Sequence, residues 1–180
     1  GGHQDEESGS FGERGQAVTA TTDGSSACFG DECPRDDDLG PLEGKWKLDF
    51  AGVGPNEGDT SWFSISDTRP EGPRACWFDD TYEFGRDGSF RNVQGDETWI
   101  EPWQGSPEGC GPPVAPHDGS NAGAWYYDNV ARTVRLDGVG SFLGLAKVVN
   151  GAELSNPSQA PAFVTYEVAE LIGDSLTVKI

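Results

Sequence analysis

Three pairs of short apolar runs, each joined by turn-forming residues, constrain the fold of this chain most strongly. The paired runs are residues 81–84 with 89–93, 124–127 with 133–136, and 163–171 with 175–180. The runs are rich in β-branched and aromatic residues, and the residues between them tolerate reversals of the chain. Each pair therefore predicts an antiparallel hairpin.

An upstream strand is predicted by strict alternation. Residues 43–50 place Trp46, Leu48 and Phe50 on one face and charged residues on the other, which is the period of a half-buried strand. Residues 60–66 alternate in the same way. Trp46 is expected in the core.

The remaining segments are less strongly patterned. Residues 98–103 and 138–149 are candidates for further strands, although residues 143–147 could equally form a helical turn. Residues 105–123 are rich in Gly and Pro, which predicts a long loop. We expect eight to ten strands and at most one short helix. The predicted fold class is all-β, an antiparallel β-sandwich or barrel with an extended N-terminal arm.

Composition agrees with many short strands. The chain has 26 Gly and 12 Pro, and its six Trp, nine Phe and four Tyr supply much of the surface that a core could bury. The formal net charge of −19 disfavours nucleic acid and anionic membranes as partners. The acidity is explained either by solubility or by binding of Ca²⁺. No apolar run approaches the roughly 20 residues that span a bilayer.

The four cysteines favour disulfides and an oxidising compartment, because their spacing does not suit a zinc site. Three pairings are possible. We favour Cys28–Cys33 and Cys76–Cys110, since the first two cysteines share the arm and the other two lie in the predicted domain. The alternative is a local pair with two free, buried thiols.

A change in composition divides the chain. Residues 1–40 are acidic and poor in large apolar residues, which is typical of an extended arm or linker, and residues 41–180 form a single predicted β domain. One segment of the arm has β-propensity and could add to a sheet edge, in this chain or in a neighbour. It comprises Ala17, Val18, Thr19, Ala20 and Thr21. The last predicted strand runs to Ile180 and leaves such an edge open.

Two resemblances to known families accompany these patterns. The run Leu42-Glu43-Gly44-Lys45-Trp46-Lys47-Leu48, with Tyr82-Glu83-Phe84, Asp87-Gly88-Ser89-Phe90 and Trp125-Tyr126-Tyr127-Asp128, is similar to lipocalin-like domains of bacterial envelope proteins. This resemblance implies a barrel whose base is closed by the Gly-x-Trp element.

The second resemblance covers residues 44–180. Its motifs are Cys76-Trp77-Phe78-Asp79-Asp80-Thr81-Tyr82, Gly95-Asp96-Glu97-Thr98-Trp99, Trp103-Gln104-Gly105, Pro116-His117-Asp118-Gly119-Ser120 and Gly144-Leu145-Ala146-Lys147. They look like a module of secreted Bacteroidota proteins that is found beside polysaccharide-degrading domains. The resemblance implies an extracellular accessory module, secreted or at the cell surface. Such modules continue with a further strand beyond the position of Ile180.

The tryptophans are the candidate ligand-binding residues, because flat sugar faces pack against indole rings. Most of them are explained equally well as core. Trp99 and Trp103 lie near turn residues and are the best candidates for an exposed pair. The predicted ligand-binding set is Trp77, Trp99, Glu101, Trp103 and Gln104.

Acidic residues suggest two further kinds of site. One structural Ca²⁺ could be held by Asp79, Asp80, Asp96, Glu97 and Asp118, although no EF-hand spacing occurs. A glycoside hydrolase would need two carboxylates that flank a sugar, and the abundance of acids makes no pair distinctive. No G-x-S-x-G, P-loop or dinucleotide fingerprint occurs either.

We therefore expect a non-catalytic extracellular module for adhesion at the cell surface, with polysaccharide as its partner. The alternative is a structural subunit that assembles with copies of itself by donating a strand from its N-terminal arm. A glycoside hydrolase is the third hypothesis.

Overall fold

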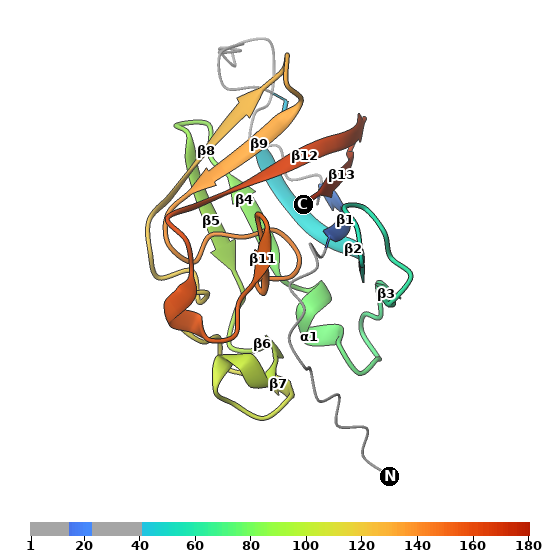
Figure 1. Cartoon of the computed structure of the whole chain (residues 1–180), viewed down its shortest axis with the longest axis vertical. Coiled ribbons are helices and arrows are strands. Elements are labelled where there is room, and N and C mark those ends of the chain that lie inside the picture. Colours follow the sequence, from blue (N-terminus) through green and yellow to red (C-terminus); the bar gives the residue numbers. More distant parts are fainter. Residues whose placement is uncertain (1–14, 23–40) are drawn as a thin grey trace.

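The structure, a computed structural model, describes residues 15–22 and 41–180 and is almost entirely β (Figure 1). It confirms the predicted all-β fold class. One short helix, α1 (Ala75–Phe78), and the 3₁₀ turns η1 (Pro102–Gln104) and η2 (Pro157–Gln159) interrupt the strands. The strands are β1 (Gly15–Thr22), β2 (Gly44–Gly54), β3 (Phe63–Ser66), β4 (Thr81–Phe84), β5 (Ser89–Val93), β6 (Thr98–Ile100), β7 (Gly109–Gly111), β8 (Gly123–Asp128), β9 (Thr133–Asp137), β10 (Val148–Val149), β11 (Ala152–Glu153), β12 (Phe163–Ile172) and β13 (Ser175–Lys179).

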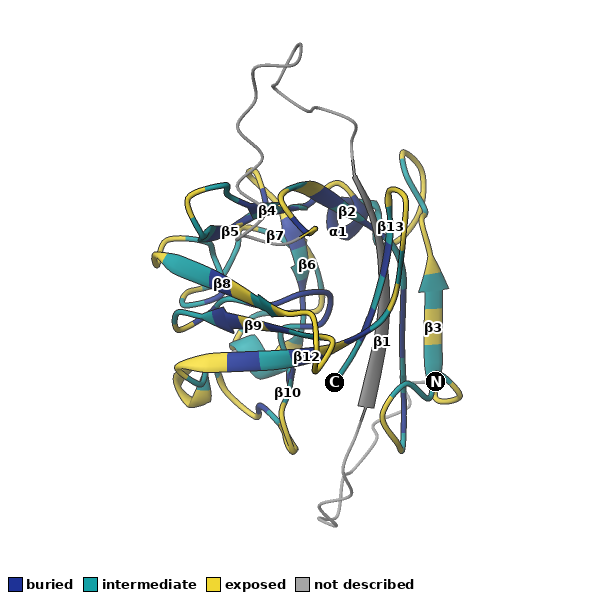
Figure 2. Ribbon diagram, turned by 90° about the horizontal axis from the view of Figure 1, so that it is seen from above, coloured by how far each residue is buried: buried dark blue, intermediate teal, exposed yellow. Residues whose placement is uncertain are grey.

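The main sheet is antiparallel and closes on itself. Its order is β1-β13-β12-β9-β8-β5-β4-β2, and β2 pairs in turn with β1, while β3 lies against the far half of β2. β1 is thus the closing strand: Ala17 faces Lys179 of β13 on one side and Gly52 of β2 on the other. Figure 2 shows the curled strands from above, with the ribbon coloured by the burial of each residue. The edge beside β13 is occupied by the chain's own β1.

The three predicted hairpins are present as β4–β5, β8–β9 and β12–β13. Their turns use residues that accept unusual backbone angles. Gly88 has φ +83° and Gly173 has φ +58°, both in the left-handed region that favours glycine. Asp87 also stabilises the first turn, because its Oδ1 accepts from the Ser89 amide at 3.0 Å.

The alternation predicted in β2 holds only for its first half. Trp46 and Leu48 are buried, whereas Phe50 is half-buried and Ala51 is buried in its place. The register against β1 shifts there, since Thr19 faces Phe50 but Ala20 faces Leu48. An extra residue in one strand moves every later side chain to the other face. The prediction that Phe50 shares the buried face was therefore wrong.

Of the strand predicted over residues 138–149, only Val148–Val149 is present, as β10, and residues 143–147 form no helical turn. Residues 138–147 have no regular secondary structure. Within them, residues 141–146, here named the plug loop, lie against buried strand residues. Asn92 forms two hydrogen bonds with the backbone of Phe142. Its Nδ2 donates to the Phe142 carbonyl at 2.8 Å, and its Oδ1 accepts from the Phe142 amide at 3.3 Å. The amides of Leu143 and Gly144 donate to the hydroxyls of Tyr166 at 2.9 Å and Tyr82 at 3.2 Å. Buried backbone groups need such partners, and side chains of the barrel supply them.

Short pairings account for the remaining differences. The strand predicted over residues 98–103 ends at Ile100, where Pro102 begins η1, and the predicted loop at 105–123 contains β7, which pairs with β6. β6–β7 and β10–β11 raise the number of strands above the predicted range.

The predicted Cys76–Cys110 disulfide is present, with 6.1 Å between the two Cα atoms. The predicted Cys28–Cys33 pair lies outside the described residues. Within the described part of the chain, no helix is long and apolar enough to cross a membrane.

Candidate functional site

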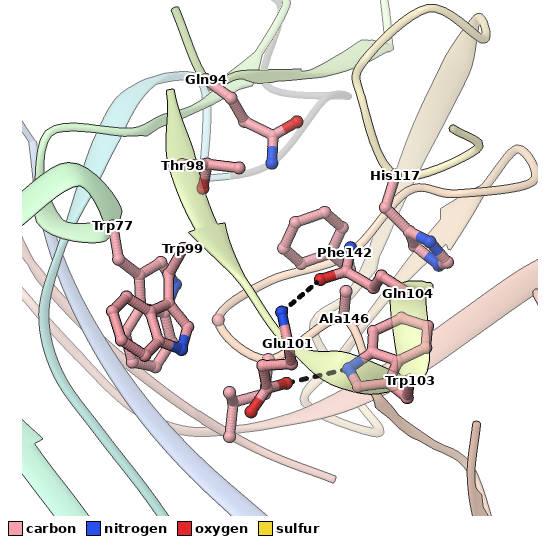
Figure 3. Close-up of a pocket in the computed structure, with 12 residues that line it drawn as sticks. Trp77, Gln94, Thr98, Trp99, Glu101, Trp103, Gln104, His117, Phe142 and Ala146 are labelled. Atoms are coloured by element: carbon pink, nitrogen blue, oxygen red, sulfur yellow. Dashed lines mark hydrogen bonds between the residues drawn. The ribbon is translucent and has the colours of Figure 1, made fainter. Parts of the chain in front are cut away.

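The disulfide places two tryptophans in one cleft. Cys76 and the buried Trp77 are neighbours in α1, while Cys110 in β7 lies directly opposite Trp99 of β6. The bond from Cys76 to Cys110 therefore holds α1 against the β6–β7 hairpin at one end of the barrel. Trp77 and Trp99 form one wall of the cleft (Figure 3).

The facing wall is built on η1. The indole Nε1 of Trp103 donates to Glu101 Oε2 at 2.9 Å, and the Glu101 amide donates to Gln104 Oε1 at 3.0 Å. These bonds fix the turn that follows β6. The Trp103 ring meets the ring of His117 edge-on, with 5.4 Å between centroids. The wall therefore continues from the rim at Trp103 to the buried His117.

Tight loop packing holds His117 in place. Its amide donates to the carbonyl of Val114 at 2.9 Å, and its ring packs edge-on against Phe142 of the plug loop at 5.9 Å. Gly140 has φ +90°, and a Cβ there would collide with the carbonyl oxygen of Pro116. Only glycine allows this close approach between the two loops.

The cleft has an accessible volume of about 20 Å³, close to the space that one water molecule needs. The residues that line it come from five separate segments of the chain. They are Trp77, Gln94, Thr98, Trp99, Glu101, Trp103, Gln104, His117, Phe142, Gly144, Leu145 and Ala146.

Three side chains that line the cleft each have one buried polar atom without a hydrogen-bond partner in the structure. These are Gln94 Oε1, Trp99 Nε1 and His117 Nδ1. Gln94 is 8% exposed and His117 is 3% exposed, so bulk water does not solvate them freely. Burial lowers the pKa of His117 to about 4, against a smaller opposing effect of Asp118, so the ring is neutral at pH 7. These three atoms have almost no accessible surface, so they lie in the packing around the cleft and not on the surface that a ligand would touch.

Asp80 is a buried acid beside Thr98. Thr98, which lines the cleft, donates from Oγ1 to Asp80 Oδ2 at 2.6 Å, while Asp80 Oδ1 has no partner. Burial raises the pKa of Asp80 to about 8; the Thr98 bond lowers it and the charge of Asp79 raises it further. Asp80 is therefore largely protonated at neutral pH and adds little charge to the cleft.

All five residues of the predicted ligand-binding set line this cleft: Trp77, Trp99, Glu101, Trp103 and Gln104. Sequence reasoning did not include Gln94, Thr98, His117 or Phe142 in the set. One signal for Gln94 was present, because the alternation of β5 puts it on the inward face with Phe90 and Asn92. Buried polar positions in a strand need partners, and such positions are candidates for a site.

The predicted calcium ligands are not gathered in this way. Asp79, Asp96 and Glu97 are exposed, Asp80 is buried against Thr98, and Asp118 Oδ1 accepts from the Ser120 amide at 3.1 Å and hydroxyl at 2.6 Å. Across residues 15–22 and 41–180, no group of three or more His, Cys, Asp or Glu side chains could hold a metal ion. A structural Ca²⁺ gains no support from this arrangement.

A second, wider depression of about 300 Å³ lies beside the β12–β13 ladder. It contains Glu57, Glu167 and Lys179, and the hydrogen bond with Glu167 is the main cause that raises the pKa of Glu57. Its carboxylates are exposed and its lining has no aromatic ring. It therefore lacks the indole rings against which a ligand could pack in the tryptophan cleft.

The cleft is therefore a narrow, aromatic-walled site whose lining includes the Glu101 carboxylate. Comparison of the chain with protein-family models, with curated proteins and with solved structures finds no match.

Proposed function

We propose that this chain is a non-catalytic extracellular module that binds polysaccharide through the cleft formed by Trp77, Trp99 and Trp103, named here the Trp cleft. The proposal rests on one observation. Three tryptophans from α1, β6 and η1 line a cleft together with the polar side chains of Glu101 and Gln104. Apolar sugar faces pack on indole rings, and sugar hydroxyls form hydrogen bonds with polar side chains beside the rings.

The composition of the cleft favours binding over hydrolysis. Glycoside hydrolysis needs two carboxyl groups about 5 to 9.5 Å apart around the scissile bond. Among the described residues that line the cleft, Glu101 supplies the only carboxylate, and it accepts the indole N–H of Trp103. A cavity of about 20 Å³ cannot enclose a sugar ring. The ring would lie across the rim, with one small group directed inward.

An oxidising, extracellular location is supported by the Cys76–Cys110 disulfide, because such bonds persist mainly outside the cytosol. The resemblance of residues 44–180 to accessory modules of secreted Bacteroidota proteins points in the same direction and suggests attachment beside polysaccharide-degrading domains.

Replacement of Trp103 tests the proposal. We expect Trp103→Ala to weaken retention on a polysaccharide affinity gel by about ten-fold or more, since the rim loses its ring and its contact with His117. The melting temperature is expected to fall by only a few degrees, because Trp103 is half-buried and lies outside the barrel core. Affinity electrophoresis and thermal unfolding measure the two effects.

Trp62→Ala is the matched control. Trp62 is 54% exposed and does not line the cleft, so its loss tests nonspecific adhesion of exposed indole. We expect Trp62→Ala to keep full retention. Retention that is unchanged in Trp103→Ala, or lost equally in both variants, would contradict the proposal.

Assembly by strand exchange is the second candidate function. It is favoured by the position of β1, which closes the barrel between β13 and β2 and is separated from the rest of the domain by residues 23–40. The same strand from another copy could occupy that place in the same register. In the structure, β1 pairs within its own chain.

A further inference from the structure

We infer that the Cys76–Cys110 disulfide is a redox gate for the Trp cleft. The cleft is formed in the oxidised chain, and reduction of this one bond releases the β6–β7 hairpin while the barrel stays folded. The consequence for binding rests on the proposed function: the oxidised chain holds polysaccharide, and the reduced chain releases it.

The β6–β7 hairpin is not part of the main sheet. β6 and β7 have three residues each and, among the described strands, pair with each other alone. An isolated two-stranded hairpin is marginally stable at best in water. Trp99 packs against the hydrophobic core of the barrel but is only half-buried, and the buried Ile100 lies outside that core. The order of the hairpin therefore depends on its attachment to the rest of the domain.

The other side of the disulfide is anchored in the barrel. Cys76 lies in α1 beside Trp77 and Phe78, which are both buried and belong to the barrel core. Loss of the bond would therefore leave α1 in place and free the hairpin. Trp99 on β6 and Trp103 on η1 belong to the freed segment, so the cleft that they line with Trp77 would open (Figure 3).

Noncovalent contacts between α1 and the hairpin are few and partly exposed. The Arg74 guanidinium lies over the Trp99 ring, 4.4 Å from its centroid, and 3.9 Å from the carboxylate of Glu108, whose side chain is 56% exposed. Exposed ion pairs contribute little to stability. Segments held in this way open locally while the rest of a protein remains folded. The disulfide suppresses such opening because it limits how far the two parts can separate.

The two cysteines differ in exposure, which sets the course of reduction. Cys110 is exposed and Cys76 is 8% exposed, so a dithiol reductant approaches from the side of Cys110. One thiolate of the reductant attacks Cys110 Sγ, the bond between the two Sγ atoms breaks, and Cys76 leaves as a thiolate that takes up a proton. The second thiol of the reductant then attacks the mixed disulfide and releases Cys110. The products are two protein thiols and the oxidised reductant, which has supplied two electrons.

Reduction of the folded chain with dithiothreitol tests the gate. The full chain with Cys28→Ser and Cys33→Ser is used beside the wild type, so that Cys76–Cys110 is the bond that responds. Hydrogen–deuterium exchange is followed in residues 98–111 and, for reference, in β9 and β12. We expect exchange in residues 98–111 to rise ten-fold or more on reduction and to return after reoxidation. Exchange in the reference strands should change by less than two-fold.

Binding is measured on the same samples by affinity electrophoresis in gels that contain laminarin, mannan or alginate. We expect retention to fall ten-fold or more on reduction. Cys76→Ser with Cys110→Ser should exchange and bind like the reduced chain, with and without dithiothreitol. Cys28→Ser with Cys33→Ser is the matched control, because it removes the same number of cysteines and should keep the full response.

The outcomes separate the gate from the function on which its consequence rests. Unchanged exchange in residues 98–111, in a chain whose thiols are fully alkylated after reduction, would overturn the inference. Loss of protection throughout β9 and β12 would also overturn it, because the bond would then hold the whole fold together. Opening of the hairpin with unchanged retention that still requires Trp103 would overturn the gate and keep the proposed function. Opening of the hairpin without retention in either state would overturn the proposed function and support the gate as a property of the fold.

Discussion

Polar side chains inside this barrel fall into two groups. Tyr82, Asn92 and Tyr166 are buried and bonded to the backbone of the plug loop, so their burial is compensated. The cost of burying Asp80 is only partly offset by hydrogen bonding. Thr98 donates to one carboxyl oxygen, and the other oxygen has no partner. An acid in this position is stable mainly in its protonated form.

At this scale we predict a pH-dependent stabilisation by Asp80→Asn. The pKa of Asp80 is about 8 when folded, against an ordinary value of 3.8, so the folded chain binds the extra proton between these values. Wild-type stability is therefore lost as pH rises from about 4 to about 8, and Asn avoids that loss. In urea titrations at pH 9, we expect the free energy of unfolding of the variant to exceed that of the wild type by about 2 kcal/mol or more. Near pH 4 the two free energies should be equal.

Asp79→Asn is the control for this prediction, because Asp79 is the exposed neighbour of the buried acid. The charge of Asp79 is the smallest of the three causes that set the pKa of Asp80, so the effect of Asp79→Asn at pH 9 should be much smaller than that of Asp80→Asn. A difference between Asp80→Asn and the wild type that does not grow with pH would contradict a raised pKa at this carboxyl.

At the level of elements, the plug loop is the segment that most depends on distant partners. It has no regular secondary structure, yet Phe142, Leu143 and Leu145 belong to the hydrophobic core. Its apolar side chains favour burial, and its backbone amides can be buried because Tyr82 and Tyr166 accept from them. Phe142 also supports His117, which joins this loop to the Trp cleft.

Removal of one hydroxyl tests the role of the plug loop. Tyr166→Phe leaves the buried amide of Leu143 without this acceptor, so we expect a loss of about 1–3 kcal/mol of unfolding free energy in urea titrations. Tyr126→Phe makes the same chemical change on β8, where the side chain is 58% exposed, and should have almost no effect. Equal stability of the two variants would show that the amide of Leu143 does not depend on this bond.

At the scale of the whole molecule, barrel closure depends on β1. Its pairing with β13 and β2 leaves neither strand with a free edge along the paired residues. Without β1 both strands would expose unpaired backbone groups, which are templates for association with other chains. The same strand that completes the fold is therefore the one that could join copies.

We predict that deletion of residues 1–22 lowers the melting temperature by several degrees and causes association, seen by size exclusion with light scattering. Deletion of residues 1–14, which keeps β1, is the control and should behave like the full chain. Strand exchange makes the opposite prediction for the oligomers: they would form in the full chain and disappear when β1 is deleted. An unchanged melting temperature after deletion of residues 1–22 would contradict closure by β1.

Local sequence patterns predicted much of the fold and five of the residues that line the Trp cleft. The hairpins and the burial of Trp46 follow from alternation and turn chemistry, which involve residues close in sequence. The bulge that turns Phe50 away from the core depends on the register with β1 and has no local signal. Likewise, the Trp99 and Trp103 rim was predicted from nearby turn residues, whereas His117 and Phe142 reach the cleft only through loop packing.

The all-β fold, the three hairpins and a cysteine pattern compatible with the Cys76–Cys110 bond could be predicted from the amino-acid sequence, because they depend on side-chain period and composition. Three features follow from the folded structure alone: β1 closes the barrel, the plug loop packs against buried strand residues, and three tryptophans line one cleft. These features depend on contacts between residues that are far apart in the sequence. Gly144 bonds to Tyr82 across 62 residues of sequence, and no spacing rule describes a partner that only folding brings within reach.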